Sequence, residues 1–310
     1  MTVAAQRPIR VAAHLIVGER EEPFLPALFR SLEGVADVLL VNDNAPEPGG
    51  PNAQMLAASA FAQRGALIVD RAPFVNFADA RNRVLAMHRA HAPGAWAAFV
   101  DADDVHRPVA QCIARNLASL GDEIALVDGY TRHYLQSFRW VIGVDRRLAF
   151  FRVTDGVRWE GDVHERLTGY TGRALVLPYV YDHYGWVLPM ERQAAKGRQY
   201  ASLGQSGRTY TPDEVAALDP GDFFAPLWPL AMPYNGSQPP ALDAVRAAME
   251  RQYESIFANA DRAIHARHDL RRRILNTFRR LNYTYRWRGR ALNPLARRLM
   301  DCTRNAVTGS

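Results

Sequence analysis

Three carboxylates, Asp101, Asp103 and Asp104, directly follow an apolar run at residues 96–100. Carboxylates one residue apart repel each other, and a shared cation relieves that repulsion. Hard oxygen ligands suit Mg²⁺ or Mn²⁺, and such an ion commonly completes its coordination shell with substrate phosphates. The pattern therefore predicts a divalent metal site at Asp101 and Asp103. The alternative is that Asp103 or Asp104 only caps a helix that begins near Pro108.

Further candidates for this chemistry lie later in the chain, at Asp162, His164, Glu165 and His183. A metal ion needs a third protein ligand, and a transfer reaction needs a general base. Each histidine alone could equally be structural. Asp162 competes with Glu165 for the role of base, because in an extended segment the two side chains point to opposite faces. Only one of them can then face the reacting atom, unless the chain turns at Gly161.

Alternating strands and helices are predicted up to about residue 130. Five apolar runs have the length of buried strands: 9–17, 38–41, 66–69, 96–100 and 124–127. Four segments have apolar residues at helical spacing: 19–32, 53–64, 77–90 and 107–120. This alternation predicts an α/β fold with a mostly parallel central sheet flanked by helices.

Asp43 and Asp101 both end predicted strands, where sheets of this kind bind their ligands. The usual connection rule predicts that these two strands are neighbours. A carboxylate such as Asp43 could accept hydrogen bonds from a pyrimidine edge. Its alternative is an Asx turn, because residues 42–44 are Asn-Asp-Asn.

The basic character of the chain is confined to its C-terminal part. Residues 261–310 contain thirteen Arg and three Asp with no Lys or Glu, a net charge of +10, so residues 1–260 carry −4. Tyr283, Tyr285 and Trp287 lie among the arginines. Residues 262–304 could therefore bind nucleic acid, lie on an anionic membrane surface, or form a solvated helical cap.

The remaining composition predicts a cytoplasmic protein. The apolar run at 9–17 is short and leads into Glu19, Glu21 and Glu22, which is unlike a signal peptide. No run of about 20 apolar residues occurs that could form a spanning helix.

Several motifs, taken in order, make the chain resemble the family 2 glycosyltransferases of the GT-A fold, over about residues 9–200. The matching stretches are Leu15-Ile16-Val17, Val41-Asn42-Asp43-Asn44, Phe77 to Asn82, Trp96 to Asp103, Gly161 to Glu165 and Asp182 to Trp186. The chain departs from the family at Gly18-Glu19-Arg20, where Asn-Glu is usual, and at Ala45, where Ser is usual.

The resemblance implies a role for each matched position on the donor side. Asp43 and Asn44 lie in the nucleotide loop, and Asp43 would contact the base of a nucleotide sugar. Arg81 would contact the base or the phosphates. Asp101 would help to hold ribose or metal, and Asp103 would ligate the divalent ion.

The resemblance also implies roles for later residues. His183 would be the late metal ligand or a diphosphate contact, and Glu165 occupies the place of the general base, with Asp162 as its competitor. Lys196 and Arg198 could neutralise the diphosphate leaving group, or they could belong to an ordinary solvated helix face.

A metal-dependent, inverting glycosyltransferase is the predicted function. Such an enzyme moves a hexosyl or pentosyl unit from a nucleoside-diphosphate sugar to a hydroxyl of a saccharide, protein or modified-base acceptor, with Mn²⁺ or Mg²⁺ as cofactor. One displacement with one base inverts the anomeric configuration. The predicted catalytic domain is 1–210, with a nucleotide-sugar half at about 1–130 and an acceptor half at about 131–210. A Pro-rich connector and a basic helical extension make up 211–310.

Three other functions remain as alternatives. The Arg-rich tail could serve a nucleic-acid-binding protein, or a glycosyltransferase that acts on a modified DNA base. A sugar-phosphate nucleotidyltransferase is less well supported, because it needs a Gly-rich phosphate loop after the first strand. Here that loop holds only Gly18 and several acids.

Overall fold

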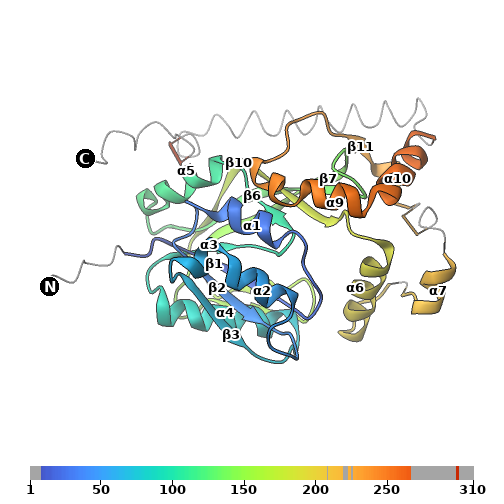
Figure 1. Ribbon diagram of the computed structural model, residues 1–310. Coiled ribbons are helices and arrows are strands. Elements are labelled where there is room, and N and C mark those ends of the chain that lie inside the picture. The colour runs from blue at the N-terminus through green and yellow to red at the C-terminus, as the bar shows by residue number, and fades with distance from the viewer. Residues whose placement is uncertain (1–7, 208, 219–222, 225, 267–297, 300–310) are drawn as a thin grey trace.

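A nine-stranded mixed sheet forms the centre of the protein (Figure 1). The computed structural model describes residues 8–207, 209–218, 223–224, 226–266 and 298–299. The strands of the sheet are β1 (Val11–Val17), β2 (Val38–Asp43), β3 (Leu67–Arg71), β4 (Trp96–Phe99), β5 (Asp104–Val105), β6 (Ile124–Leu135), β7 (Trp140–Arg152), β10 (Arg173–Trp186) and β11 (Met232–Pro233). Their order is β3-β2-β1-β4-β7-β6-β10-β5, and β11 pairs with β7.

Strands β1 to β4 run parallel to one another. Strand β1 pairs with β2 along one edge and with β4 along the other. The prediction that Asp43 and Asp101 end neighbouring strands is therefore wrong, because β1 lies between the strands that precede them. The predicted α/β class is confirmed, since helices flank a central mixed sheet that is largely parallel.

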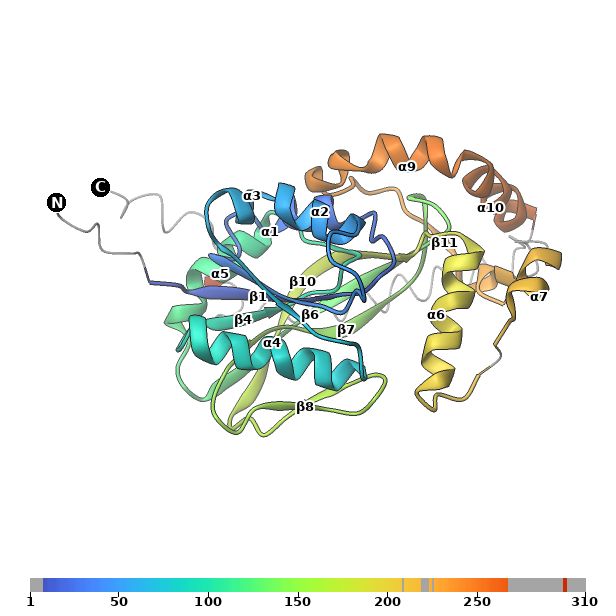
Figure 2. The ribbon, with the colours of Figure 1, turned by 60° about the horizontal axis from the view of Figure 1, so that its bottom comes forward.

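Helices cover both faces of the sheet (Figure 2). The helices of the first half are α1 (Leu25–Leu32), α2 (Pro51–Ala58), α3 (Ala60–Gln63), α4 (Phe77–His91) and α5 (Val109–Asn116). Alternate residues of β1 face opposite layers, as the pleat of a strand requires. Leu15 packs in one core cluster with Leu28 of α1 and Ile113 of α5, whereas Ala12 packs with Val84 of α4.

The second half of the sheet brings the late part of the chain to the carboxylates. The strand predicted at 124–127 continues to Leu135 as β6, which runs antiparallel to β7 and parallel to β10. The two-residue strand β5 pairs with β10 so that Asp104 lies opposite His183. A small hairpin of β8 (Arg158–Glu160) and β9 (Arg166–Thr168) lies below α4 in Figure 2.

Two predicted helices are shorter than expected. The helix predicted at 19–32 begins only at Leu25, because Pro23 and Pro26 fit no further into a helix than its first turn. The polar segment 186–210 also favours a helix in sequence, and the helix within it is α6 (Met190–Ser202), since β10 continues to Trp186. After α6, Gly204 has a φ of 86°, a left-handed conformation that favours glycine.

The C-terminal part contains α7 (Pro212–Ala217), α9 (Arg246–Gln252) and α10 (Glu254–Ala266). Leu242 and Met249 pack in one core cluster with Phe24 and Tyr184. Leu299 is fully buried, and its carbonyl accepts a hydrogen bond of 3.1 Å from Asn116 Nδ2.

Most of the basic extension and its proposed partner surface lie outside the described residues. Of residues 262–304, the structure describes only 262–266 and 298–299. None of the helices in the described ranges is long and apolar enough to cross a membrane.

Candidate functional site

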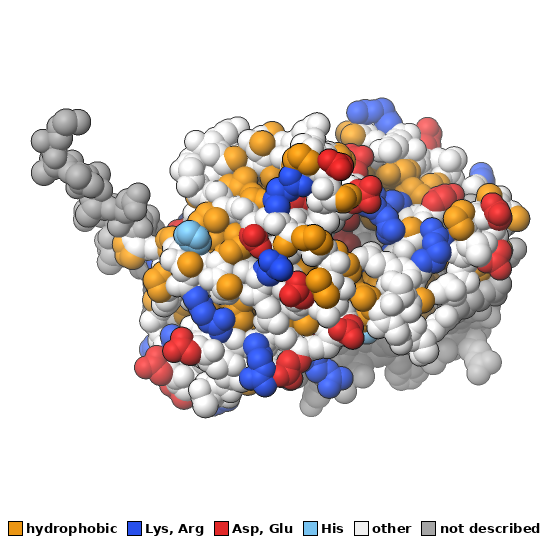
Figure 3. Space-filling view, turned by 90° about the horizontal axis from the view of Figure 1, so that it is seen from below, with side chains coloured by type: hydrophobic (Ala, Val, Ile, Leu, Met, Phe, Trp, Pro, Cys, Tyr) orange, Lys and Arg blue, Asp and Glu red, His pale blue; other side chains and the backbone are white. Residues whose placement is uncertain are grey.

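A cavity of ≈ 840 Å³ lies at the carboxyl ends of β1 and β4, with α6 on its other side. Val17 and Asp101 line it from the sheet, and Lys196 and Tyr200 line it from α6. Seen from below, this face is hollowed to the right of the centre, where acidic and basic side chains lie next to each other (Figure 3). The cavity is at the position where an open α/β sheet is expected to bind its ligand.

The carboxylates after β4 are arranged by a tight turn. The amide of Asp104 donates to the carbonyl of Asp101 at 3.1 Å, and the amide of Asp101 donates to Asp104 Oδ2 at 2.9 Å. Asp104 is fully buried and holds this turn. The alternative that Asp103 or Asp104 caps the next helix is wrong, because the N-cap of α5 is Pro108 and no side chain caps it.

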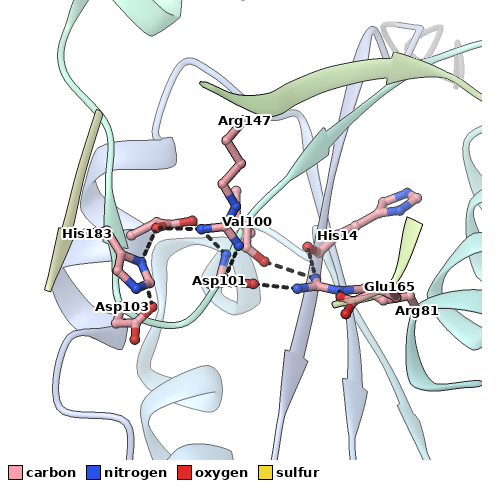
Figure 4. A network of polar contacts seen from close by, with 9 residues as sticks. His14, Arg81, Val100, Asp101, Asp103, Arg147, Glu165 and His183 are labelled. Carbon is pink, nitrogen blue, oxygen red and sulfur yellow. Dashed lines mark hydrogen bonds and ion pairs between the residues drawn. The ribbon is translucent and has the colours of Figure 1, made fainter. Parts of the chain in front are cut away.

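His183 is oriented by two of these carboxylates (Figure 4). Its Nδ1 lies 2.8 Å from Asp104 Oδ1 and 3.2 Å from Asp103 Oδ1. Both neighbours are acceptors, so Nδ1 carries the proton that is donated and Nε2 is the remaining ring nitrogen. Burial lowers the pKa of His183, but the charge of Asp103 and the hydrogen bond to Asp104 outweigh burial and raise the pKa.

Asp103 and His183 direct ligand atoms toward one point beside Gly185. A Cβ atom on Gly185 would lie 2.6 Å from Asp103 Oδ2 and 2.7 Å from His183 Nε2. Ligand atoms of Asp101, Asp103 and His183 lie within 4.8 Å of one another. Carboxylate oxygens with one imidazole nitrogen form a donor set that fits a divalent ion such as Mn²⁺. These residues could therefore hold a metal ion, and Gly185 leaves the space for it.

Asp101 differs from Asp103 because guanidinium groups contact both of its oxygens (Figure 4). Arg81 pairs with Oδ1, and Arg147 pairs with Oδ2. Burial would raise the pKa of Asp101, but Arg147 and Arg81 outweigh it and hold the pKa far below its ordinary value. The carboxylate is thus ionised, and its charge is already balanced by protein.

Arg81 connects three parts of the site. Besides Asp101 it contacts Glu165, with 3.3 Å between Nε and Oε1. Its Nη1 donates to the carbonyl of Val100 at 3.1 Å, and its guanidinium carbon lies 4.2 Å from the centre of the Phe99 ring. The Arg81 side chain is only 2% exposed, so it acts mainly on neighbouring side chains.

The structure separates the two candidate bases. Glu165 lines the cavity, and its side chain is 12% exposed. Asp162 is not among the lining residues; its Oδ1 accepts a hydrogen bond of 2.6 Å from Asn76 at the start of α4. The chain turns at His164 between them, where φ is 56°, and also at Gly161 directly before Asp162, where φ is 103°.

Of the two residues predicted to form the nucleotide loop, only Asn44 lines the cavity. Its Nδ2 donates to Asn42 Oδ1 at 2.8 Å and to the carbonyl of Ala72 at 2.9 Å. Asp43 is not among the lining residues. Its Oδ1 accepts from the amide of Ala45 at 3.0 Å, which is the Asx-turn geometry considered as its alternative.

Only one of the two predicted α6 cations faces the cavity. Lys196 lines it, and its Nζ lies 5.7 Å from the centre of the Tyr200 ring. Burial lowers the pKa of Lys196, but nearby negative charges, of which Asp103 has the largest effect, outweigh burial and raise the pKa. The ammonium therefore stays charged. Arg198 is not a lining residue, and its Nη1 donates to the carbonyl of Tyr210 at 2.6 Å.

Sequence reasoning missed Arg147, Glu22 and Arg192, which all line the cavity. Arg192 Nη2 on α6 lies 3.4 Å from Glu22 Oε2 in the loop after β1. Burial, followed by the charge of Asp103, raises the pKa of Glu22 to about 7. No local pattern marks these three residues, because each reaches the site only through tertiary contacts.

Comparison with known proteins gives similarity to solved structures only. No family model matches the chain, and no curated protein matches it. A mannosyltransferase, PcManGT from Pyrobaculum calidifontis in complex with GDP-Man and Mn²⁺, has 16% identity and a TM-score of 0.39, over 95% of this chain and 86% of that one. S. aureus TarS 1-349 has 11% identity and a TM-score of 0.37, over 82% and 90%. A mycobacterial protein has 20% identity and a TM-score of 0.27, over 40% and 41%.

Proposed function

We propose that the protein is a metal-dependent glycosyltransferase that moves a sugar from a nucleoside-diphosphate sugar to an acceptor hydroxyl. The observation that carries the proposal is the convergence of Asp103 Oδ2 and His183 Nε2 beside Gly185, in a cavity that Lys196 and Glu165 also line. Metal ligands and an ammonium group suit a diphosphate, and a carboxylate suits an acceptor proton. A glycosyl transfer needs both, one for the diphosphate that leaves and one for the hydroxyl that attacks.

The leaving-group end of the site consists of Asp103, His183, Lys196 and Arg192. When bound, Mn²⁺ or Mg²⁺ would stabilise the negative charge that develops on the diphosphate. Asp103 and His183 would hold that ion. The Lys196 ammonium and the Arg192 guanidinium line the same cavity and could bind the phosphate oxygens directly.

The acceptor end of the site is proposed to be Glu165. Its carboxylate would take the proton from a saccharide or protein hydroxyl as the oxygen attacks the anomeric carbon. Arg81 holds Glu165 by a contact of 3.3 Å and holds Asp101 at the same time, so the base has a fixed position relative to the metal side. One attack with one base inverts the anomeric configuration.

Calorimetry of UDP and GDP binding tests this proposal. Binding of one of them should require Mn²⁺, should be lost in EDTA, and should weaken by about 10-fold or more in Asp103→Ala, as typical of damage to a metal site. Asp155→Ala is the control, because Asp155 is exposed and does not line the cavity. Equal binding with Mn²⁺, with EDTA and in Asp103→Ala would refute the metal-dependent function.

A further inference from the structure

His164, directly before the proposed base, has an unusual backbone conformation. Its φ of 56° is left-handed, and Gln136 is the only other non-glycine residue with a positive φ in the described ranges. This conformation is unfavourable for an ordinary L-residue, although His tolerates it better than most. The turn at His164 directs Glu165 into the cavity, while Asp162 faces α4.

The His164 side chain contacts Tyr200 near the end of α6 and Gln205, which follows that helix. Its Nε2 lies 3.0 Å from Gln205 Nε2, and because an amide nitrogen can only donate, the ring nitrogen accepts. The ring also meets the Tyr200 ring nearly at right angles, with 6.0 Å between ring centres.

The same helix reaches the leaving-group end of the cavity. Lys196 lies one turn before Tyr200 and interacts electrostatically with Asp103. Tyr200 also packs against Phe77, the first residue of α4, with 5.5 Å between ring centres. Helix α6 thus contacts both the residue before the base and the helix that carries Arg81.

We infer that His164 is a positioning residue for Glu165, and that α6 links the position of the base to occupation of the diphosphate site. The inference rests on the proposed function. Tyr200 belongs to α6, and the amide of Gln205, which follows the helix, donates to the Tyr200 carbonyl at 3.1 Å, so a diphosphate bound at Lys196 also acts on these two residues. Through these two side chains the helix holds the His164 turn, and the turn sets the direction of the Glu165 carboxylate.

Two substitutions separate the backbone conformation from the side-chain contact. Glycine adopts a positive φ freely, so His164→Gly keeps the turn and removes the ring. A β-branched residue is strongly disfavoured there, so His164→Val opposes the turn and also removes the ring. Ser202→Ala is the matched control, because Ser202 lies in the last turn of α6 and does not line the cavity.

Release of UDP from UDP-glucose and of GDP from GDP-mannose, with Mn²⁺, measures turnover. In His164→Gly we expect kcat to fall by about 10- to 100-fold, as for a misplaced catalytic group, with the Kd of the nucleoside diphosphate within about 2-fold of wild type. His164→Val should lose at least as much, and Ser202→Ala should equal wild type. Gln205→Ala should reproduce part of the loss and add nothing in the His164→Gly background, since both changes remove one contact. Unchanged kcat in His164→Gly would refute the positioning role.

Hydrogen–deuterium exchange of residues 161–167 tests the link through α6. UDP or GDP with Mn²⁺ should slow this exchange in wild type and in Ser202→Ala, but not in His164→Gly or Gln205→Ala. If wild type neither binds these nucleotides nor releases them from the sugars, the proposed function has failed, and this inference falls with it. If wild type does both and the His164 and Gln205 variants behave identically to it, only this inference is refuted.

Discussion

Gly185→Ala is the most direct test of where a metal ion would bind. The added Cβ would lie 2.6 Å from Asp103 Oδ2 and 2.7 Å from His183 Nε2. Non-bonded contacts of carbon are normally about 3.5–4.0 Å, so the methyl group overlaps both atoms by roughly 1 Å. Ligand atoms of Mg²⁺ or Ca²⁺ stand about 2.0–2.6 Å from the ion, so the methyl group and a cation require the same space. The substitution therefore removes the site without removing any ligand.

The expected effect is large on binding and moderate on folding. Damage to residues that only support a metal ligand costs about 10- to 100-fold in affinity. Direct occlusion should cost at least about 100-fold, which corresponds to about 2.7 kcal/mol. Overpacking costs typically about 1–3 kcal/mol of stability, against about 5–15 kcal/mol for a folded domain, so the variant should remain folded. Gly185 has no positive φ that alanine would oppose.

The assay is calorimetry of UDP and GDP with Mn²⁺, together with the thermal unfolding midpoint of each variant. Gly143→Ala is the matched control, because Gly143 is also a strand glycine but a Cβ there meets nothing within 4 Å. Gly143→Ala should bind as wild type, and Gly185→Ala should show no metal-dependent binding while its unfolding remains cooperative. Wild-type affinity in a folded Gly185→Ala protein would show that Asp103 and His183 do not form the metal site.

Two further predictions concern the base and the pH dependence of stability. Glu165→Gln should lower kcat by about 100- to 10,000-fold with unchanged UDP or GDP affinity, whereas Asp162→Asn should retain turnover; the opposite result moves the base to Asp162. Burial is the main cause that lowers the pKa of His88 and of His106 from 6.5 to about 4. As pH falls, both histidines are therefore protonated in the unfolded state before they are protonated in the folded state. The free energy of unfolding should therefore fall as pH drops from about 6.5 to about 4, by on the order of 3 kcal/mol for each histidine. Urea unfolding of wild type and of His88→Gln at several pH values measures this fall. An equal dependence of the unfolding free energy on pH in the two proteins would contradict the prediction.

Local sequence patterns were sufficient to predict the parallel half of the fold. The apolar runs that become β1, β2 and β4 are buried along most of their length, which is why their composition indicates central strands, whereas β3 at the edge of the sheet is partly exposed. The order of the strands in the sheet could not be predicted in this way. A run of apolar residues indicates that a strand is buried, but it does not indicate which strands lie beside it. The position of β1 between β2 and β4 therefore could not be predicted from spacing.

The same distinction explains which parts of the site could be predicted. Asp101 and Asp103 are recognisable because their chemistry lies within three consecutive residues, and His183 joins them through the pairing of β5 with β10. Arg147 becomes important only because β7 runs antiparallel beside β4, which brings its guanidinium to Asp101 across 46 residues of chain. Gly185 carries no functional group, and its role is the space that a side chain would fill. The charged residues of the candidate metal site could therefore be predicted from the sequence. The space beside Gly185 could not, because it depends on the fold and has no pattern in the linear sequence.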